Sequence, residues 1–151
     1  PIEGSLRQQA KAAGVMPSVV FPGFTNRPWE ALCALDVFIM PSLNEGLPLA
    51  LLEAMASGCC PIAMGVGGVP EVITRNDLGW LIDAGDCEKF YQAMEGAARS
   101  DPEALLGMGQ RAREYVLSHF TAEALFAQHA DLIEKSFQPG NGVAGWARSA
   151  H

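Results

Sequence analysis

Two glutamates, Glu45 and Glu53, are separated by eight positions, and between them the sequence changes from turn-forming to helix-forming residues. On a helix this spacing corresponds to roughly 12 Å along the axis. A turn before a helix N-terminus presents free backbone N–H groups and the positive end of the helix dipole, which together bind phosphate. Gly46 lets a ligand approach this backbone closely. A ligand with phosphate in its middle and hydroxyl groups at both ends would therefore reach both carboxylates, and a nucleotide sugar has this layout.

The residues around these glutamates predict a strand, a turn and a helix in succession. Val37–Met40 is a short apolar run of strand type, Pro48 suits the first turn of a helix, and Gly58 suits its end. The helix is apolar apart from Glu53, so we expect it to be buried, where an unpaired carboxylate is costly. A purely structural interpretation stays open. Glu45 would then be a first-turn acid that favours the helix dipole, and Glu53 an acid whose hydrogen bonds are satisfied within the fold.

Short strands alternate with helices over the first half of the chain. We predict strands at residues 18–21, 37–40, 61–64 and 80–82, and helices at residues 5–13, 28–35, 49–56 and 71–74. This alternation predicts an α/β fold, a Rossmann-like doubly wound parallel sheet, in which ligands bind at the carboxyl ends of the strands. Three loops should meet at that edge: the central turn, Gly23-Phe24 and the glycine-rich segment 65–70.

After Ala84 the pattern changes to helices alone. Asp86, Asp101 and Thr121 are each placed to cap the start of one of these helices. The late helices are expected to expose an apolar patch. We therefore predict one partial domain over residues 1–137, followed by a flexible tail at residues 138–151, which is rich in Gly and Ala.

Composition excludes several classes of protein. The 151 residues are 49% hydrophobic and 18% charged, which fits one folded domain or part of one. The formal net charge of −7 argues against a basic nucleic-acid-binding surface, so no nucleic acid partner is expected. No apolar run is long enough to span a bilayer, and no signal peptide is visible. We expect a cytoplasmic location, peripheral at the inner membrane in the full-length protein.

The remaining chemistry-bearing residues do not form a site of their own. Gly65–Pro70 fails the dinucleotide fingerprint because Pro70 stands at the third glycine position, so we interpret it as a flexible loop against a ligand. The four cysteines lack the paired spacing of a zinc site and are interpreted as reduced core thiols. The three histidines are scattered, so no metal site is predicted.

Several segments resemble, in order, the retaining glycosyltransferases of the GT-B fold, family 4 (the group 1 family). The stretch from Glu45-Gly46-Leu47-Pro48 to Glu53 resembles the E-x7-E signature of that family. Four other segments match in the same order: Val20-Phe21-Pro22-Gly23-Phe24, Ala34-Leu35-Asp36-Val37-Phe38-Ile39-Met40-Pro41-Ser42, Gly67-Gly68-Val69-Pro70-Glu71-Val72-Ile73 and Gly79-Trp80-Leu81-Ile82. Each segment is short, but the ordered set is specific and covers about residues 1–137.

The resemblance implies that this chain binds a nucleotide-diphosphate sugar, a UDP- or GDP-sugar, without a metal or cofactor. Glu45 is the implied catalytic residue at the donor sugar, and Glu53 is implied to accept hydrogen bonds from the ribose hydroxyls. Backbone N–H groups near residues 46–48 would hold the diphosphate, and residues 23–24 would lie at the base. The implied donor-binding residues are Gly23, Phe24, Asn44, Glu45, Gly46, Leu47, Pro48 and Glu53.

The sequence also departs from the family pattern. Two strands that open the family's C-terminal domain, an Arg and a Lys that clamp the diphosphate, and the whole acceptor-binding domain have no counterpart, and Arg7 and Lys11 are not at the clamp position. We expect the glycan or lipid-linked acceptor to bind through the missing domain, the fragment to be inactive alone, and an exposed sheet edge to favour self-association. A non-catalytic nucleotide-sugar binding module and an epimerase-like enzyme stay open as alternatives.

Overall fold

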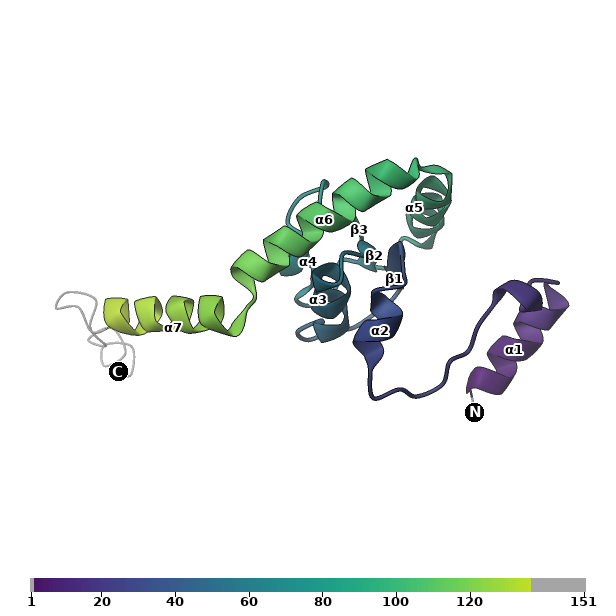
Figure 1. Cartoon of the computed structure of the whole chain (residues 1–151), viewed down its shortest axis with the longest axis horizontal. Coiled ribbons are helices and arrows are strands. Elements are labelled where there is room, and N and C mark those ends of the chain that lie inside the picture. Colours follow the sequence, from purple (N-terminus) through teal and green to yellow (C-terminus); the bar gives the residue numbers. More distant parts are fainter. Residues whose placement is uncertain (1, 137–151) are drawn as a thin grey trace, which may run out of the picture.

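The computed structural model describes residues 2–136 (Figure 1). The elements, in chain order, are α1 (Ile2–Ala12), the 3-10 helix η1 (Met16–Ser18), α2 (Pro28–Leu32), β1 (Val37–Met40), α3 (Leu49–Ala56), β2 (Cys60–Met64), α4 (Val69–Val72), β3 (Trp80–Ile82), α5 (Cys87–Arg99), α6 (Pro102–His119) and α7 (Ala122–Ser136). The predicted tail at residues 138–151 lies outside the described residues.

The three strands form one parallel sheet in the order β1-β2-β3. Met40 of β1 pairs with Ala63 of β2, and Met64 pairs with Ile82 of β3, so the strands end at one common edge. The predicted Rossmann-like α/β fold with a parallel sheet is therefore confirmed. The central strand β2 is buried along its whole length, as expected for a strand covered on both faces.

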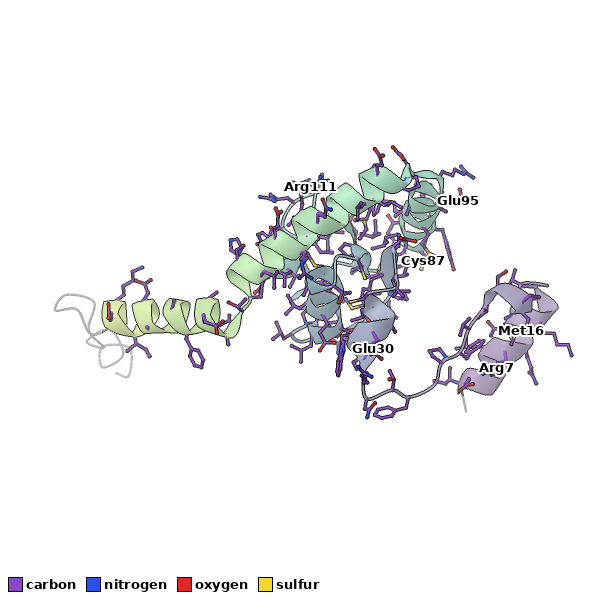
Figure 2. The ribbon with its side chains drawn as sticks, viewed as in Figure 1. Arg7, Met16, Glu30, Cys87, Glu95 and Arg111 are labelled. Atoms are coloured by element: carbon purple, nitrogen blue, oxygen red, sulfur yellow. The ribbon has the colours of Figure 1, made fainter. Side chains whose placement is uncertain are left out.

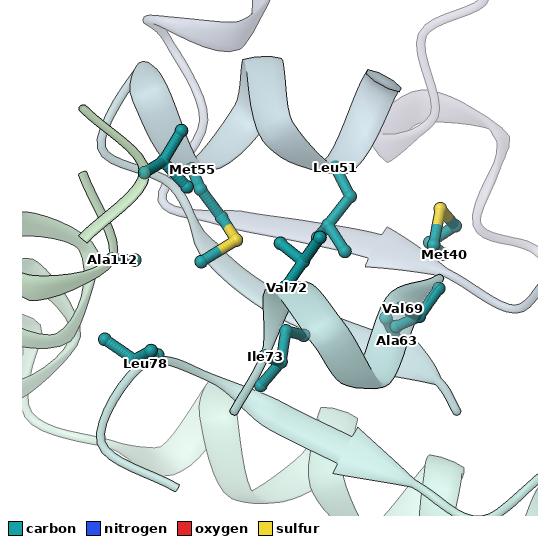
Figure 3. Close-up of a cluster of buried hydrophobic side chains, with 10 residues drawn as sticks. Met40, Leu51, Met55, Ala63, Val69, Val72, Ile73, Leu78 and Ala112 are labelled. Atoms are coloured by element: carbon teal, nitrogen blue, oxygen red, sulfur yellow. The ribbon is translucent and has the colours of Figure 1, made fainter. Parts of the chain in front are cut away.

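Helices cover the two faces of the sheet with separate apolar cores. On one face, Leu51 and Met55 of α3 point toward Val72 of α4 (Figure 3), and Ala112 and Val116 of α6 complete this cluster. On the other face, α5 packs its buried Phe90, Ala93 and Ala97 against Ile62, Met64 and Ile82. This three-layer arrangement, with helices on both faces of the sheet, leaves the carboxyl edge of the sheet for the loops that follow β1 and β2.

Helix α6 closes the opposite, amino-terminal edge. The Cys60 thiol lies 3.1 Å from the Met108 sulfur, and the Arg113 guanidinium donates to the carbonyl of Ala56 at the end of α3. A side chain at Gly109 would overlap the carbonyl oxygen of Gly58, so the two backbones are in direct contact. Gly58 itself has φ +88° and ends α3 with a Schellman motif, in which the amide of Cys59 donates to the carbonyl of Ala54.

The sequence signals for helix starts were correct. The Asp86 carboxylate accepts from the amide of Lys89, and the Asp101 carboxylate from the amide of Glu103. The Thr121 hydroxyl accepts from the amide of Ala124. Helix ends were less accurate, because the helix predicted over residues 28–35 ends at Leu32 and the helix predicted over residues 71–74 is α4.

The strand predicted at residues 18–21 is wrong. Ser18 is the last residue of η1, residues 19–21 are irregular chain, and Val20 is 83% exposed. Figures 1 and 2 place α1, with Arg7, and Met16 apart from the sheet, at the end of an extended linker. The Arg7 guanidinium lies 4.4 Å from the centre of the Phe21 ring, so the segment packs on α1 instead. An apolar run forms a strand only where a neighbouring strand accepts its hydrogen bonds, and none lies beside it here.

Two other surfaces stay open among the described residues. Strand β1 forms an edge of the sheet, and its Ile39 is 41% exposed beside a groove of about 490 Å³ that it forms with α5 and α6. Helix α7 extends away from the body (Figure 1), with Phe126 75% exposed, so the late helices do expose apolar side chains as predicted. Self-association through the β1 edge stays a prediction.

All four cysteines are free thiols, but only two of them belong to the core. Cys59 and Cys60 are buried, and burial raises the pKa of the Cys60 thiol to about 12. Cys33 and Cys87 are exposed, so the interpretation of all four as core thiols is wrong for these two.

The contact between α6 and the end of α3 predicts a large cost for Gly109→Ala. The new methyl group would meet the backbone of Gly58, which cannot move without displacing the end of α3, so we expect the free energy of unfolding to fall by about 1–3 kcal/mol. Gly96→Ala on α5, where no atom lies within 4 Å, should instead raise it by about 0.5–1 kcal/mol. Urea unfolding of the two variants measures both changes, and equal effects would refute the contact.

Candidate functional site

The central turn, residues 44–48, joins the carboxyl end of β1 to the start of α3. Pro48 is fully buried, and its carbonyl accepts from the amides of Leu51 and Leu52, which fixes the first turn of the helix. Gly46 and Leu47 are exposed, and neither amide donates to an acceptor within the described part of the chain. These two N–H groups stand in front of the helix N-terminus and are available to an anion. Pro48 has no N–H, so it shapes the turn and does not donate.

The glycine-rich loop that follows β2 lies directly against this turn. The amide of Gly68 donates to the carbonyl of Gly46 at 3.0 Å. Gly67 has φ +53°, and a side chain there would overlap the carbonyl oxygen of Glu45. The predicted flexible loop against a ligand is therefore held by backbone contacts with the turn. Sequence reasoning missed this contact, although the Gly67-Gly68 pair was a visible signal for a close backbone approach.

Glu45 and Glu53 are both accessible, which corrects the expectation of a buried helix. Only Leu51, Ala54 and Met55 of α3 are buried, whereas Glu53 is exposed. Glu45 is half-buried and precedes the helix, so it is not a first-turn acid. Neither carboxylate makes a hydrogen bond or ion pair with another described residue. The interpretation of Glu53 as a satisfied buried acid is therefore wrong, and both carboxylates can accept hydrogen bonds from a ligand.

In the described part of the chain, no positive side chain is bonded to the turn. Among residues 2–136, no lysine or arginine forms an ion pair or a side-chain hydrogen bond with residues 44–53. Arg27, on the linker to α2, is paired with Glu30 at 2.6 Å, and Arg7 is paired with Glu3 on α1. The backbone N–H groups and the α3 dipole contribute positive potential at the turn.

The structure does not bring the third loop to this edge. Gly23 has φ +72° and Phe24 is 98% exposed, and both lie in the linker between α1 and α2. Asn44, in contrast, is exposed within the turn itself. Contacts of Gly23 and Phe24 with a base therefore stay predictions, because the expected strand that would carry them to the sheet is not formed.

Metal binding and membrane crossing have no support in the described residues. Over residues 2–136, no three His, Cys, Asp or Glu side chains come together as a metal site. None of the helices in the same range combines the length and the apolar character that crossing a membrane requires.

A family model described as "Glycosyl transferases group 1" matches residues 2–100. The chain belongs to this family. It is 36% identical over 126 residues to N-acetyl-alpha-D-glucosaminyl L-malate synthase of Bacillus anthracis, a match that covers 83% of this chain and 32% of the relative. It is 30% identical over 142 residues to a GDP-mannose-dependent alpha-(1-6)-phosphatidylinositol monomannoside mannosyltransferase of Mycobacterium tuberculosis, covering 88% of this chain and 37% of that one. The chain thus spans about a third of the length of these relatives.

Two solved structures of other proteins superpose on the fold of this chain. Sucrose-phosphate synthase from Thermosynechococcus elongatus matches with a TM-score of 0.73 and 26% identity, over 86% of this chain and 33% of that chain. HepE of Anabaena, solved in complex with UDP, matches with a TM-score of 0.71 over 87% of this chain and 36% of that chain. At 22% identity, HepE supports the fold alone. The sequence matches confirm the predicted family, and the structural matches confirm its Rossmann-like domain.

The free carboxylates predict that Glu45→Gln and Glu53→Gln leave stability unchanged. Each substitution keeps the side-chain shape and removes a charge that has no partner among the described residues, so the free energy of unfolding should stay within about 0.5 kcal/mol of the original. Asp86→Ala is the contrasting variant and should lower stability, because it removes the carboxylate that caps α5 and is paired with Lys89 at 3.0 Å. Denaturant unfolding compares the three variants. A marked loss of stability for Glu53→Gln would restore the interpretation of Glu53 as a structural acid.

Proposed function

We propose that this chain is the donor-binding part of a retaining glycosyltransferase and that residues 44–53 hold a nucleotide-diphosphate sugar. One observation carries the proposal: the amides of Gly46 and Leu47, which have no acceptor among residues 2–136, stand before the N-terminus of α3. They lie in the sequence between Glu45 and Glu53, whose carboxylates have no partner among the same residues. The amides and a helix dipole equivalent to about half a positive charge would offset the charge of the diphosphate. No metal or cofactor enters this proposal.

The two carboxylates then act at opposite ends of the donor. Glu53 is exposed on the outer face of α3, where it would accept hydrogen bonds from the two ribose hydroxyls. Glu45, in the turn itself, would contact the donor sugar and stabilise the positive charge that develops there as the bond to the diphosphate breaks. Retention of the anomeric configuration would follow from a front-face or short-lived ion-pair route, and no residue here is assigned as a covalent nucleophile.

The proposed donor class is a UDP- or GDP-sugar. The mycobacterial relative, 30% identical to this chain, is named as GDP-mannose-dependent, and the Anabaena structure, whose likeness supports the fold alone, was solved with UDP. The acceptor would be a glycan or a lipid-linked glycan bound by a second domain, since Gly46, Leu47 and Leu49 leave the turn open to solvent. Transfer by this chain alone is therefore not part of the proposal.

Calorimetric titration of the chain with UDP, GDP and ADP tests the donor site. We expect one nucleotide to bind selectively and Glu53→Ala to weaken it about 10- to 100-fold, because hydrogen bonds to a charged acceptor contribute about 1.5–3 kcal/mol. Glu95→Ala is the matched control, since Glu95 is an exposed acid on α5 at a distance from the turn (Figure 2). Equal weakening of binding by both variants would show that the effect comes from net charge alone. If no nucleotide binds, the proposed donor site is contradicted.

Comparing nucleotides with and without the sugar separates the roles of the two glutamates. Glu45→Ala should leave the affinity for the free nucleoside diphosphate unchanged and weaken the nucleotide sugar, because Glu45 acts only at the sugar. In a whole transferase that carries this chain, the product should keep the anomeric configuration of the donor, as read by proton NMR. An inverted product would refute the retaining mechanism without affecting the donor site.

A further inference from the structure

The contact between the glycine-rich loop and the central turn reaches three residues of the turn. Gly67 packs on the carbonyl of Glu45, and the amide of Gly68 donates to the carbonyl of Gly46 at 3.0 Å. A side chain at Gly68 would lie 2.8 Å from that same oxygen and 3.4 Å from a ring carbon of Pro48. The loop therefore touches the turn through its carbonyl groups.

Peptide geometry determines from this contact which way the amides of Gly46 and Leu47 point. In a trans peptide the carbonyl of one residue and the N–H of the next lie in one plane and point in opposite directions, and no cis peptide is present among the described residues. Because the Glu45 carbonyl faces Gly67, the N–H of Gly46 points away from the loop. Because the Gly46 carbonyl accepts from Gly68, the N–H of Leu47 points away from it too.

The loop is itself fixed at both ends. The amide of Gly65 donates to the carbonyl of Ile82 on β3 at 2.7 Å, which ties the start of the loop to the sheet. Val69 and Val72, just after the loop, are fully buried in the core beneath α3. A loop anchored in this way can hold the orientation of the turn that rests on it.

We propose that Gly67 and Gly68 are positioning residues for the donor site, which orient the amides of Gly46 and Leu47 toward the diphosphate. The proposal rests on the proposed donor-binding function and adds the part of the chain that prepares the turn before a ligand arrives. Only glycine fits either position, because any side chain would separate the loop from the turn. The peptides 45–46 and 46–47 would then be free to rotate, and the amides of Gly46 and Leu47 would no longer be held toward the diphosphate.

Gly68→Ala is the sharpest variant. Gly68 has φ −79°, which any L-residue adopts, so alanine adds only the clash with the Gly46 carbonyl. Gly67→Ala adds both a clash and a positive φ. Gly85→Ala is the control for the positive φ alone, since Gly85 has φ +84° and no atom within 4 Å.

The experiment combines calorimetry with amide NMR of the whole chain. We expect Gly68→Ala and Gly67→Ala to weaken UDP or GDP binding at least 10-fold and to shift the amide resonances of Gly46 and Leu47, while Gly85→Ala changes affinity less than 2-fold. Unchanged affinity and unchanged resonances in a folded Gly68→Ala variant would overturn the proposal. A general loss of folding would be visible as a loss of dispersion across the whole amide spectrum. In that case the binding and resonance measurements on Gly68→Ala are repeated at a lower temperature, where the variant folds.

The NMR arm also separates this proposal from the donor site on which it rests. If the unsubstituted chain binds no nucleotide, the proposed function fails, yet the resonances of Gly46 and Leu47 still report whether Gly68 orients the turn. If Gly68→Ala shifts these resonances but no nucleotide binds, Gly68 orients the turn without a diphosphate ligand. That result would overturn the assignment of the site to the diphosphate. Weakened binding with unshifted resonances would overturn the mechanism while the donor site stands.

Discussion

The rest of the site depends on one backbone-to-backbone contact, between the loop after β2 and the turn after β1. Parallel strands end at the same edge, so their following loops are neighbours. At Gly67 and Gly68 there is no side chain, and the carbonyls of Glu45 and Gly46 fill the space. The sheet thereby determines the position of the turn, and the turn determines the start of α3.

A site built from amides suits a chain whose charge is otherwise unfavourable to phosphate. The net charge is −7, and the turn is flanked by two carboxylates with no lysine or arginine bound to it among the described residues. An anion in this place gains from fixed dipoles whose orientation has been settled by folding, whereas an exposed lysine would lose side-chain entropy on binding. The same carboxylates repel phosphate but accept hydroxyl groups, which favours a ligand with sugars on both sides of its phosphates.

Much of the fold follows from local rules, and the remainder depends on contacts that the sequence does not display. Caps at Asp86, Asp101 and Thr121 and the apolar strands β1 and β2 were predictable, because each needs only its own residues. The segment 18–21 has strand composition, but a strand exists only with a partner beside it. Helix α3 has almost no polar residue to mark its outer face, so its composition suggested burial and concealed the exposure of Glu53. The central turn was located correctly, while its contact with Gly67 required the tertiary structure.

The exposure of the site limits the chemistry that this surface can perform by itself. Glycosyl transfer requires the activated sugar to meet an acceptor hydroxyl and to avoid water, so the reacting carbon has to be enclosed. Here Gly46 and Leu47 are open to solvent, and Leu47 and Leu49 beside them are each 61% exposed. Apolar side chains around an anion site provide a surface that a second domain can cover while it excludes water. A nucleotide sugar bound at the proposed site would therefore stay exposed to water, and its sugar would be subject to hydrolysis until that surface is covered.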